Sequence, residues 1–437
     1  MQTKNDSTSS YKWVILLIAT ISQTFATFVT YGIGPLASLW QHVHHLSQFQ
    51  AGLLVSAVNI GPIFSMLFFG NLMDRYGERW IVGVGSILLG ASMLFAYPVT
   101  NYTYLIVILL FVGVWYGTAQ LGGSKAIVKW FPPQRRGLAM GIRQTGIPIG
   151  GALASSTLPF FFYQYGLPSV ILVQAIASIS GGLLFILFYR EEHSPVQKTE
   201  TVPFLTKLKK VQRNHSLYPI FLIGITMISL QMVLVAHLMS YFTSEVHTNL
   251  HHAGTLLSVV LLGGMIGRIL LAWASDTVCK GNRVVPLQIT IGITVLLLLC
   301  MSYFISYITF GSLIILCFFL GFFAIGWFSL FIILVSEKSD PQFIDLTVSF
   351  ALTLNQFAIV LAPTLFGILV DYLHSYTAPF SILALLIALS GIWLTITEYR
   401  NKQLRIQNFL SVKQILKIIY HSKLTISPFK NELYPKA

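Results

Sequence analysis

The chain has 437 residues, of which 55% are hydrophobic and only 9% are charged. A water-soluble domain carries roughly 25% charged residues, so this composition excludes a soluble globular protein, a nucleic-acid-binding domain and a disordered chain. The net charge of +13 therefore has to be interpreted from where the basic residues lie. Because the 3 cysteines give neither a disulfide framework nor a metal-ligand spacing, we expect an integral membrane protein.

Apolar runs long enough to cross a bilayer follow one another along the chain. About 20 mostly apolar residues span the hydrocarbon core, and charged residues, Gly, Pro or Asn separate the runs. The first set of predicted spans is 12–38, 50–70, 80–99, 102–129, 136–162 and 168–189. The second set is 218–243, 251–275, 286–306, 311–335, 344–370 and 377–398. The runs lack the alternation of a membrane β-barrel, so the sequence predicts an all-α fold of twelve transmembrane helices.

The basic residues predict the orientation. All but one of the 27 Lys and Arg residues lie in the two tails or in and beside every second loop. Cytoplasmic loops collect Lys and Arg, so both termini are predicted to face the cytoplasm. The first span is expected to be retained, since its apolar run is too long for a signal peptide and lacks a cleavage site. We expect a monomer in the plasma (inner) membrane, with the lipid bilayer as partner and without cofactor, metal or nucleic acid.

Two sets of six spans joined by a polar segment indicate an internal duplication. The expected parts are an N-tail at 1–11, a six-helix bundle at 12–189, a cytoplasmic central loop at 190–217, a second six-helix bundle at 218–398 and a basic tail at 399–437. Corresponding spans carry corresponding polar residues. Arg143–Gln144 in the fifth span matches Asn355–Gln356 in the eleventh, and Asp74 and Asp276 close the second and eighth spans.

Three segments carry a family resemblance. GNLMDRYGER (70–79), KWFPPQRRGLAMG before the fifth span and PTLFGILVD closing the eleventh resemble landmarks of the major facilitator superfamily, over about residues 12–398. The resemblance implies the major facilitator fold, with two pseudo-symmetric halves, and a secondary transporter in which the 70–79 loop helps to hold the halves together on the cytoplasmic side. The gating residues expected from it are Gly70, Asp74, Arg75, Gly77, Arg79 and, in the second half, Asp276. Glu78 departs from the pattern, which usually has a basic residue there.

Arg268 is the residue most indicative of a substrate. It lies about 12 Å of helix away from Asp276 and is the one basic residue outside the clusters. A guanidinium at that depth costs several kcal/mol unless it is paired or faces water, and no acidic residue lies mid-membrane. Arg268 is therefore predicted to hold a carboxylate through its planar fork; snorkelling or pairing with backbone carbonyls is the alternative. The placement is similar to that in the oxalate/formate and monocarboxylate porter groups, where this arginine engages the substrate carboxylate.

Other polar residues inside the spans complete the expected site between the halves. They are Arg143, Gln144, Asn355, Gln356, Gln23, Thr27, Tyr31, Gln120 and Gln231. Arg143 has two open interpretations, because its stem is long enough to snorkel inward or to reach the cavity. His237 is either a hydrogen-bonded packing residue or the carrier of a coupling proton.

The predicted function is transport of a small organic anion, mono- or dicarboxylate-like, by alternating access. Proton symport through His237, anion exchange and facilitated diffusion remain open as coupling modes. No P-loop or catalytic motif is present, so neither a pump driven by ATP nor an enzyme is expected. The alternatives are proton-driven efflux of lipophilic drugs or metabolites and a membrane sensor with a transporter fold. The outer-loop histidines, such as His42 and His251, are a weak indication of metal binding.

Overall fold

The computed structural model describes residues 3–97, 101–191, 209, 211–279, 281–340 and 342–425. Its N-terminal half consists of α1 (Thr3–Thr30), α2 (Ile33–His44), α3 (Gln48–Tyr76), α4 (Glu78–Leu94), α5 (Tyr102–Trp130), α6 (Pro133–Gln144), α7 (Gly146–Tyr165) and α8 (Leu167–Phe188). Its C-terminal half consists of η1 (His215–Leu217), α10 (Tyr218–Glu245), α11 (Leu250–Thr277), α12 (Val284–Phe304), η2 (Ile305–Tyr307), α13 (Phe310–Ala324), α14 (Phe328–Lys338), α15 (Ile344–Leu373) and α16 (Thr377–Thr425). No strand occurs among the described residues, so the all-α prediction is confirmed.

The described helices fit the twelve predicted spans. Ten segments of the described chain are long and apolar enough to span a bilayer. The remaining two crossings are α4, with 17 residues, and the consecutive helices α6 and α7. The predicted number of spans is therefore confirmed, although several spans begin or end at other residues than expected.

Three predicted spans are interrupted where a single helix was expected. The breaks lie at 31–32 between α1 and α2, at Thr145 between α6 and α7, and at 325–327 between α13 and α14. Proline explains the first two, because Pro35 and Pro148 cannot donate a backbone N–H to the carbonyls of Tyr31 and Gln144, and their rings clash with those carbonyls. Both prolines then lie in the first turn of the following helix, where proline is well tolerated.

The third break lies where two helices approach each other closely. A Cβ atom on Gly326 would lie 2.1 Å from the carbonyl oxygen of Phe322 and 2.8 Å from the carbonyl carbon of Gly267 on α11. Only glycine fits a contact this short. The junction of α13 and α14 therefore packs directly on α11, one residue before Arg268.

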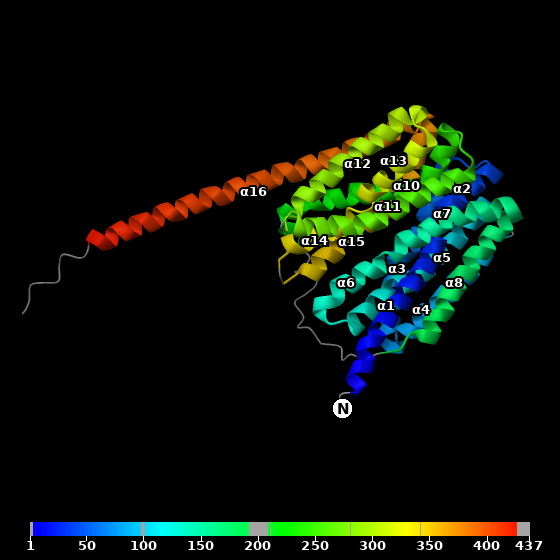
Figure 1. Cartoon of the computed structure of the whole chain (residues 1–437), viewed down its shortest axis with the longest axis horizontal. Helices are drawn as coiled ribbons and strands as arrows, with labels where there is room; N and C mark the ends of the chain where they lie inside the picture. The colour runs from blue at the N-terminus through cyan, green and yellow to red at the C-terminus, as the bar shows by residue number, and fades with distance from the viewer. Residues whose placement is uncertain are drawn as a thin grey trace, which may run out of the picture.

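The two halves form separate groups of helices that meet through reciprocal pairs. In Figure 1 most helices of the N-terminal half lie below those of the C-terminal half, and α2 and α7 reach up to α10 and α11, where the two groups converge. The extensive contacts between the halves join α3 to α15 and α7 to α11. These are the second span of one half with the fifth of the other, in both directions, which is the pattern that a two-fold relation between the halves requires.

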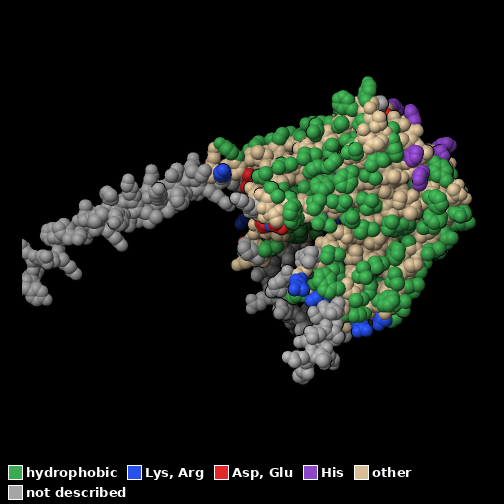
Figure 2. All heavy atoms as spheres, viewed as in Figure 1, with side chains coloured by type: hydrophobic (Ala, Val, Ile, Leu, Met, Phe, Trp, Pro, Cys, Tyr) green, Lys and Arg blue, Asp and Glu red, His purple; other side chains and the backbone are tan. Residues whose placement is uncertain are grey.

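Surface histidines and surface Lys and Arg residues lie toward opposite ends of the bundle. Figure 2 shows the histidines gathered at one end, and Lys and Arg toward the other. We call the first the histidine end, which includes His42, His251 and His374, and the second the basic end, which includes Arg75 and Arg283. The halves converge at the histidine end, and the ribbons of α6 and α14 lie apart toward the basic end (Figure 1).

The last helix continues well past the predicted span. We expected the twelfth span to end at residue 398, but α16 runs to Thr425 and projects from the bundle (Figure 1). The sequence after Arg400 explains the continuation, since it contains no Gly or Pro before Pro428 and is rich in good helix formers.

Candidate functional site

Arg143 lies inside the N-terminal half, with no measurable exposure of its side chain. Its Nη2 donates to Gln23 Oε1 at 2.7 Å and to the carbonyl oxygens of Gln120 at 2.7 Å and Ala119 at 3.2 Å. The guanidinium rests on Gly123, where a Cβ atom would lie 2.4 Å from Arg143 Nε. Arg143 therefore does not snorkel to the basic end; it binds the acceptors of α1 and α5.

A chain of side chains leads from Arg143 toward the other half. Gln23, which accepts from Arg143, donates through Nε2 to the hydroxyl of Tyr116 at 3.2 Å. At the break between α1 and α2, the Tyr31 hydroxyl accepts from Nε2 of Gln231 at 3.3 Å. Since Gln231 belongs to α10 in the C-terminal half, this bond joins the halves within the interior.

Arg268 has fewer hydrogen bonds than Arg143, although one buried N–H of each has no partner in the described structure, Nη1 in Arg268 and Nε in Arg143. Arg268 is 8% exposed, its Nε donates to the Ile325 carbonyl at a long 3.4 Å, and its Nη1 has no hydrogen-bond partner. The guanidinium carbon lies 5.2 Å from the centre of the Phe328 ring. No ion pair within the described part of the chain includes Arg268. A buried cation without a full set of acceptors is a receptor for an acceptor group of opposite charge.

Asn355 and Gln356 of α15, the pair matched to Arg143 and Gln144, lie in two different environments. Gln356 donates through Nε2 to the Asn59 carbonyl of α3 at 3.0 Å, which is a contact between the halves. Asn355 is 2% exposed, and neither atom of its amide has a partner in the described structure. Its Oδ1 lies against Gly224 of α10, so Asn355 points into the C-terminal half.

The remaining expected residues have local roles. Thr27 donates through its hydroxyl to the Gly146 carbonyl at 3.0 Å and so ties α1 to the start of α7. Gln120 contributes its backbone oxygen to Arg143. Gln144 is half-buried beside the break at Thr145. The structure thus brings Gln23, Gln120 and Thr27 to the Arg143 side and Tyr31 and Gln231 to the Arg268 side.

His237 lies at the contact between the halves, fully buried. Its Nε2 is 2.9 Å from the Pro363 carbonyl and its Nδ1 is 3.2 Å from Gln48 Oε1. The carbonyl can only accept, so Nε2 carries a proton. Rotation of the Gln48 amide would satisfy Nδ1 with or without a second proton, so the geometry accommodates both charge states.

The expected gating loop of the N-terminal half makes its contacts within that half. Gly77 has φ +82°, and a Cβ atom there would lie 2.2 Å from Glu191 Oε1, so this position requires glycine. The backbone N–H of Arg79 donates to the same oxygen at 2.7 Å, and Arg79 Nε donates to the Ile186 carbonyl at 2.6 Å. Gly70 accepts through its carbonyl from Lys125 at 2.9 Å. Arg75 is exposed, and the side chain of Asp74 lies outside the described residues.

Glu78, the departure from the expected pattern, forms a buried ion pair. Its carboxylate has no exposure and lies 2.7 Å from the Nζ atom of Lys129 at the end of α5. Burial raises the pKa of the neighbouring Glu191 above its usual value; the bond from the Arg79 N–H opposes this shift, and the charge of Glu78 adds to it.

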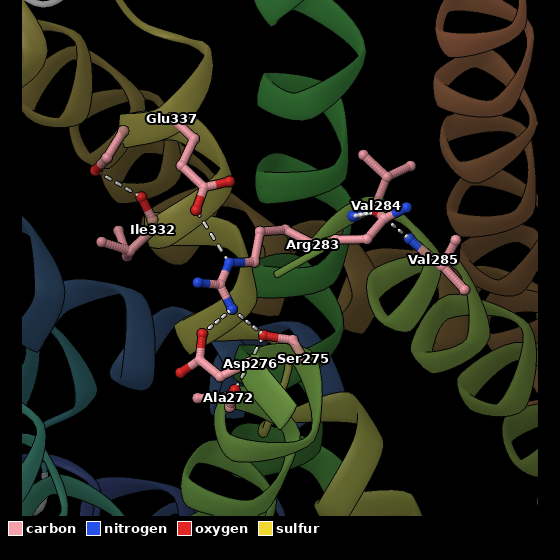
Figure 3. A network of polar contacts seen from close by, with 10 residues as sticks. Ala272, Ser275, Asp276, Arg283, Val284, Val285, Ile332 and Glu337 are labelled. Carbon is pink, nitrogen blue, oxygen red and sulfur yellow. Dashed lines mark hydrogen bonds and ion pairs between the residues drawn. The ribbon is translucent and has the colours of Figure 1, made fainter. Parts of the chain in front are cut away.

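The loop between α11 and α12 of the C-terminal half also forms an ion pair with the end of the fourth span, with the acidic residue on the helix. Figure 3 shows Arg283, before α12, between Asp276 and Glu337. Arg283 Nε donates to Glu337 Oε1, at the end of α14, at 3.0 Å. Glu337 is the last residue but one of α14, as Lys129 is of α5, and both helices end the fourth span of their half. In each half, the residue at this position of the fourth span thus pairs with an oppositely charged residue of the loop after the second span, Lys129 with Glu78 and Glu337 with Arg283.

No group of three or more potential metal ligands occurs among the residues that the structure describes. Several residues that contact the candidate site or join the halves were not expected from the sequence, namely Tyr116, Ile325, Phe328 and Asp371. Three of them act through a common aromatic side chain or a backbone carbonyl, which leave no pattern in a sequence. Asp371 did leave one, since an acidic residue is unfavourable in the last turn of a helix.

Comparison with known proteins gives this arrangement a family. The family model of the Major Facilitator Superfamily matches residues 19–363 and 238–429. An uncharacterised MFS-type transporter of Mycobacterium tuberculosis is 29% identical over 283 residues, which are 64% of this chain and 61% of the relative. NarK2 of the same organism, a probable nitrate/nitrite transporter, is 27% identical over 261 residues, covering 58% of this chain and 64% of the relative. The chain thus spans about three fifths of the length of these relatives.

Solved structures agree with the family at the level of the fold. A bacterial homologue of the human lysosomal transporter Spinster, in an inward-facing and occupied conformation, has a TM-score of 0.71 against this chain. The identity is 13%, and the alignment covers 89% of this chain and 97% of that chain. Because the family model covers most of the sequence and the twelve-span fold is shared, the chain belongs to the Major Facilitator Superfamily.

Proposed function

We propose that this protein is a secondary transporter that carries a small organic anion, mono- or dicarboxylate-like, by alternating access. The observation that carries the proposal is Arg268, a cation that is 8% exposed and whose Nη1 has no partner. It lies on the side of α11 where Tyr31 of the other half meets Gln231. An anion bound to Arg268 is therefore within reach of both halves.

Charge complementarity supports an anion over a lipophilic cation. The described ion pairs use Glu78, Asp276, Glu337 and Glu398, all at the basic end of the chain's helices. A cation entering the interior would meet Arg268 without a compensating carboxylate, which is unfavourable at low dielectric. The relative whose name states a substrate, the probable nitrate/nitrite transporter, also handles an anion.

The two arginines have different roles in this proposal. Arg143 already binds three acceptors, so it holds Gln23 and α5 in position. Arg268 has spare donors and makes the direct contact with the anion. Tyr31, Gln231 and, once a rotation of the halves has broken its bond to Asn59, Gln356 would add hydrogen bonds, and Asn355 would take part only through a change of its own rotamer.

The halves at 12–189 and 218–398 act as the moving units, with the segment at 190–217 as a cytoplasmic linker. Both termini lie in the cytoplasm, and the membrane is the plasma (inner) membrane. The separation of the basic end from the histidine end supports this orientation (Figure 2). In it, the present structure is closed toward the outside. His237 is the proposed proton carrier, because it lies in the closed contact and its hydrogen bonds suit both charge states.

A ligand panel on the purified protein tests the proposal. A compound that binds the native state raises the melting temperature Tm. We expect mono- and dicarboxylates to raise Tm, and neutral sugars and lipophilic cations to leave it unchanged. Arg268→Gln should lower the affinity for the anion by well over tenfold, since losing one desolvated charge pair costs about 2–5 kcal/mol. Arg268→Lys should restore it only in part, because a point charge cannot reproduce the fork.

Arg213→Gln is the matched control, since Arg213 is an exposed arginine that belongs to neither the expected gating residues nor the expected binding residues. It should respond to anions like the unmodified protein. If a neutral or cationic compound stabilises the protein and Arg268→Gln does not alter that effect, the anion proposal is wrong and drug efflux becomes the better reading.

A further inference from the structure

One carboxylate reaches across the contact between the halves at the histidine end. Asp371, in the last turn of α15, accepts from the backbone N–H of Gln48 at 2.9 Å and from that of Phe49 at 2.8 Å. The two oxygens take one donor each. Gln48 and Phe49 begin α3, in the other half.

The negative charge of Asp371 is unfavourable at the C-terminus of its own helix, α15, and favourable at the N-terminus of α3. The C-terminus of a helix carries partial negative charge, which disfavours an acidic residue in the last turn of α15. The N-terminus of α3 carries partial positive charge and has N–H groups without partners inside the helix. Ser47 accepts from the N–H of Gln50, so Asp371 supplies the acceptors for the two donors before it.

The backbones of α15 and α3 approach each other closely beside this contact. A Cβ atom on Gly367, one turn before Asp371, would lie 2.3 Å from the Gln48 carbonyl oxygen. The Gln48 side chain is held separately, by Nδ1 of His237 at 3.2 Å. The first turn of α3 is therefore bound by the C-terminal half through its backbone donors and through one side chain.

We infer that Asp371 is a latch that holds the histidine end closed by capping α3 from the opposite half. The inference rests on the proposed alternating access. When the halves separate at this end, the N–H groups of Gln48 and Phe49 lose a charged acceptor in a partly buried contact. The strength of the Asp371 contact thus sets how often this end opens, independently of which anion binds at Arg268.

Distances between two spin labels measure the opening directly. The labels are placed on His44→Cys in α2 and His251→Cys in α11, which are exposed at the histidine end in opposite halves. The background replaces Cys279, Cys300 and Cys317 with Ala. Double electron–electron resonance on the full chain, without added anion, then gives the ratio of the long-distance to the short-distance population.

Four variants separate the latch from other effects. Asp371→Asn removes the charge. Gln48→Pro removes one N–H donor at the first position of α3, where proline is favoured. Ser47 already has φ −71° and ψ 168°, which suits a residue before proline. Gln48→Ala keeps the N–H but loses the contact with His237. Glu245→Gln neutralises an exposed acidic residue in the last turn of α10 at the same end.

We expect Asp371→Asn and Gln48→Pro to raise the long-distance population roughly tenfold, as the loss of a charge-assisted bond implies. Gln48→Ala and Glu245→Gln should change it less than twofold. An unchanged ratio in Asp371→Asn, or equal ratios in Gln48→Pro and Gln48→Ala, overturns the latch. If Asp371→Asn does not purify, the two Gln48 variants decide. The result does not depend on the substrate. If the latch is overturned, the Arg268 proposal still stands, and if the Arg268 proposal is overturned, the latch still stands.

Discussion

At the residue scale, the ion pair of Glu78 and Lys129 allows a prediction on what happens when one charge is removed or the two charges are exchanged. Glu78 has no exposure and Lys129 is 27% exposed, so Lys129→Gln leaves a buried carboxylate unpaired. We expect the free energy of unfolding to fall by about 3 kcal/mol, seen as a lower Tm in detergent. The double variant Glu78→Lys, Lys129→Glu should recover most of the loss, because Arg283 and Glu337 already use that polarity in the other half. Lys129→Gln with an unchanged Tm would contradict the assignment.

Glu191 makes a prediction about pH. Burial and the charge of Glu78 raise its pKa in the folded protein, so the folded state binds more protons than the unfolded state between the usual pKa and the raised one. Stability must therefore fall as pH rises through that window and is fully present below it. Glu191→Gln keeps an oxygen for the Arg79 N–H and removes the charge. Its Tm should exceed that of the unmodified protein at neutral pH and converge with it at acid pH. A constant difference across pH would show that Glu191 does not titrate in this way.

The two buried arginines show how far single residues can be interpreted from a sequence. Arg268 and Arg143 were both candidates because charge inside an apolar span is costly. Each keeps one buried N–H without a partner, Nε in Arg143 and Nη1 in Arg268. That Arg143 alone has three close acceptors could not be predicted, since two of them are backbone carbonyls of α5. Backbone acceptors become available only when two helices are placed side by side.

At the scale of the element, apolar runs predicted the crossings but not their interruptions. Pro35 and Pro148 are visible in the sequence, and their effect on the carbonyls four residues earlier follows from covalent geometry alone. The break at Gly326 is different, because it depends on the approach of α11. The first two breaks could have been predicted from local chemistry, and the third needed the packing.

Gly326 therefore supports a prediction on how packing maintains the site. In Gly326→Ala the new Cβ atom would lie 2.1 Å from the Phe322 carbonyl oxygen and 2.8 Å from the backbone of Gly267. The junction must shift away from α11, which displaces Ile325 from Arg268. We expect a lower Tm and a more than tenfold loss of anion affinity by thermal shift. Gly292→Ala in α12 is the control, since no atom lies within 4 Å of its new Cβ, and Tm should stay or rise. Equal effects of both variants would contradict the packing argument.

At the scale of the whole molecule, the reciprocal pairs α3–α15 and α7–α11 explain why one end can close while the other opens. The closest contacts of each pair lie toward the histidine end, such as Gly52 with Pro363 and Gly254 with Ser155, so a rotation that brings the basic ends together would separate the histidine end. The duplication was predictable from matched polar residues in corresponding spans. The closed end was not, because the same sequence must form both states, and the contacts that favour one of them, such as Asp371 on α3, link residues more than 300 positions apart.

The last prediction concerns a disulfide that blocks this rotation. The hydroxyl oxygens of Ser38 on α2 and Ser240 on α10 are 3.0 Å apart and belong to opposite halves. A cysteine pair at these positions, in a background without Cys279, Cys300 and Cys317, should form a disulfide on oxidation that holds the histidine end closed. Uptake into proteoliposomes of the carboxylate that raises Tm most should then stop, and return on reduction, because the cycle needs both ends to open in turn.

A second disulfide within one half separates the lock from general rigidity. Thr226 on α10 and Ser390 on α16 have their hydroxyl oxygens 3.3 Å apart, and both belong to the C-terminal half. Crosslinking this pair constrains the C-terminal half without joining it to its partner, so uptake should persist after oxidation. If both pairs block uptake, rigidity rather than relative rotation limits transport. If the pair Ser38→Cys, Ser240→Cys crosslinks fully and uptake continues, the halves do not need to part at the histidine end, and alternating access through this contact is wrong.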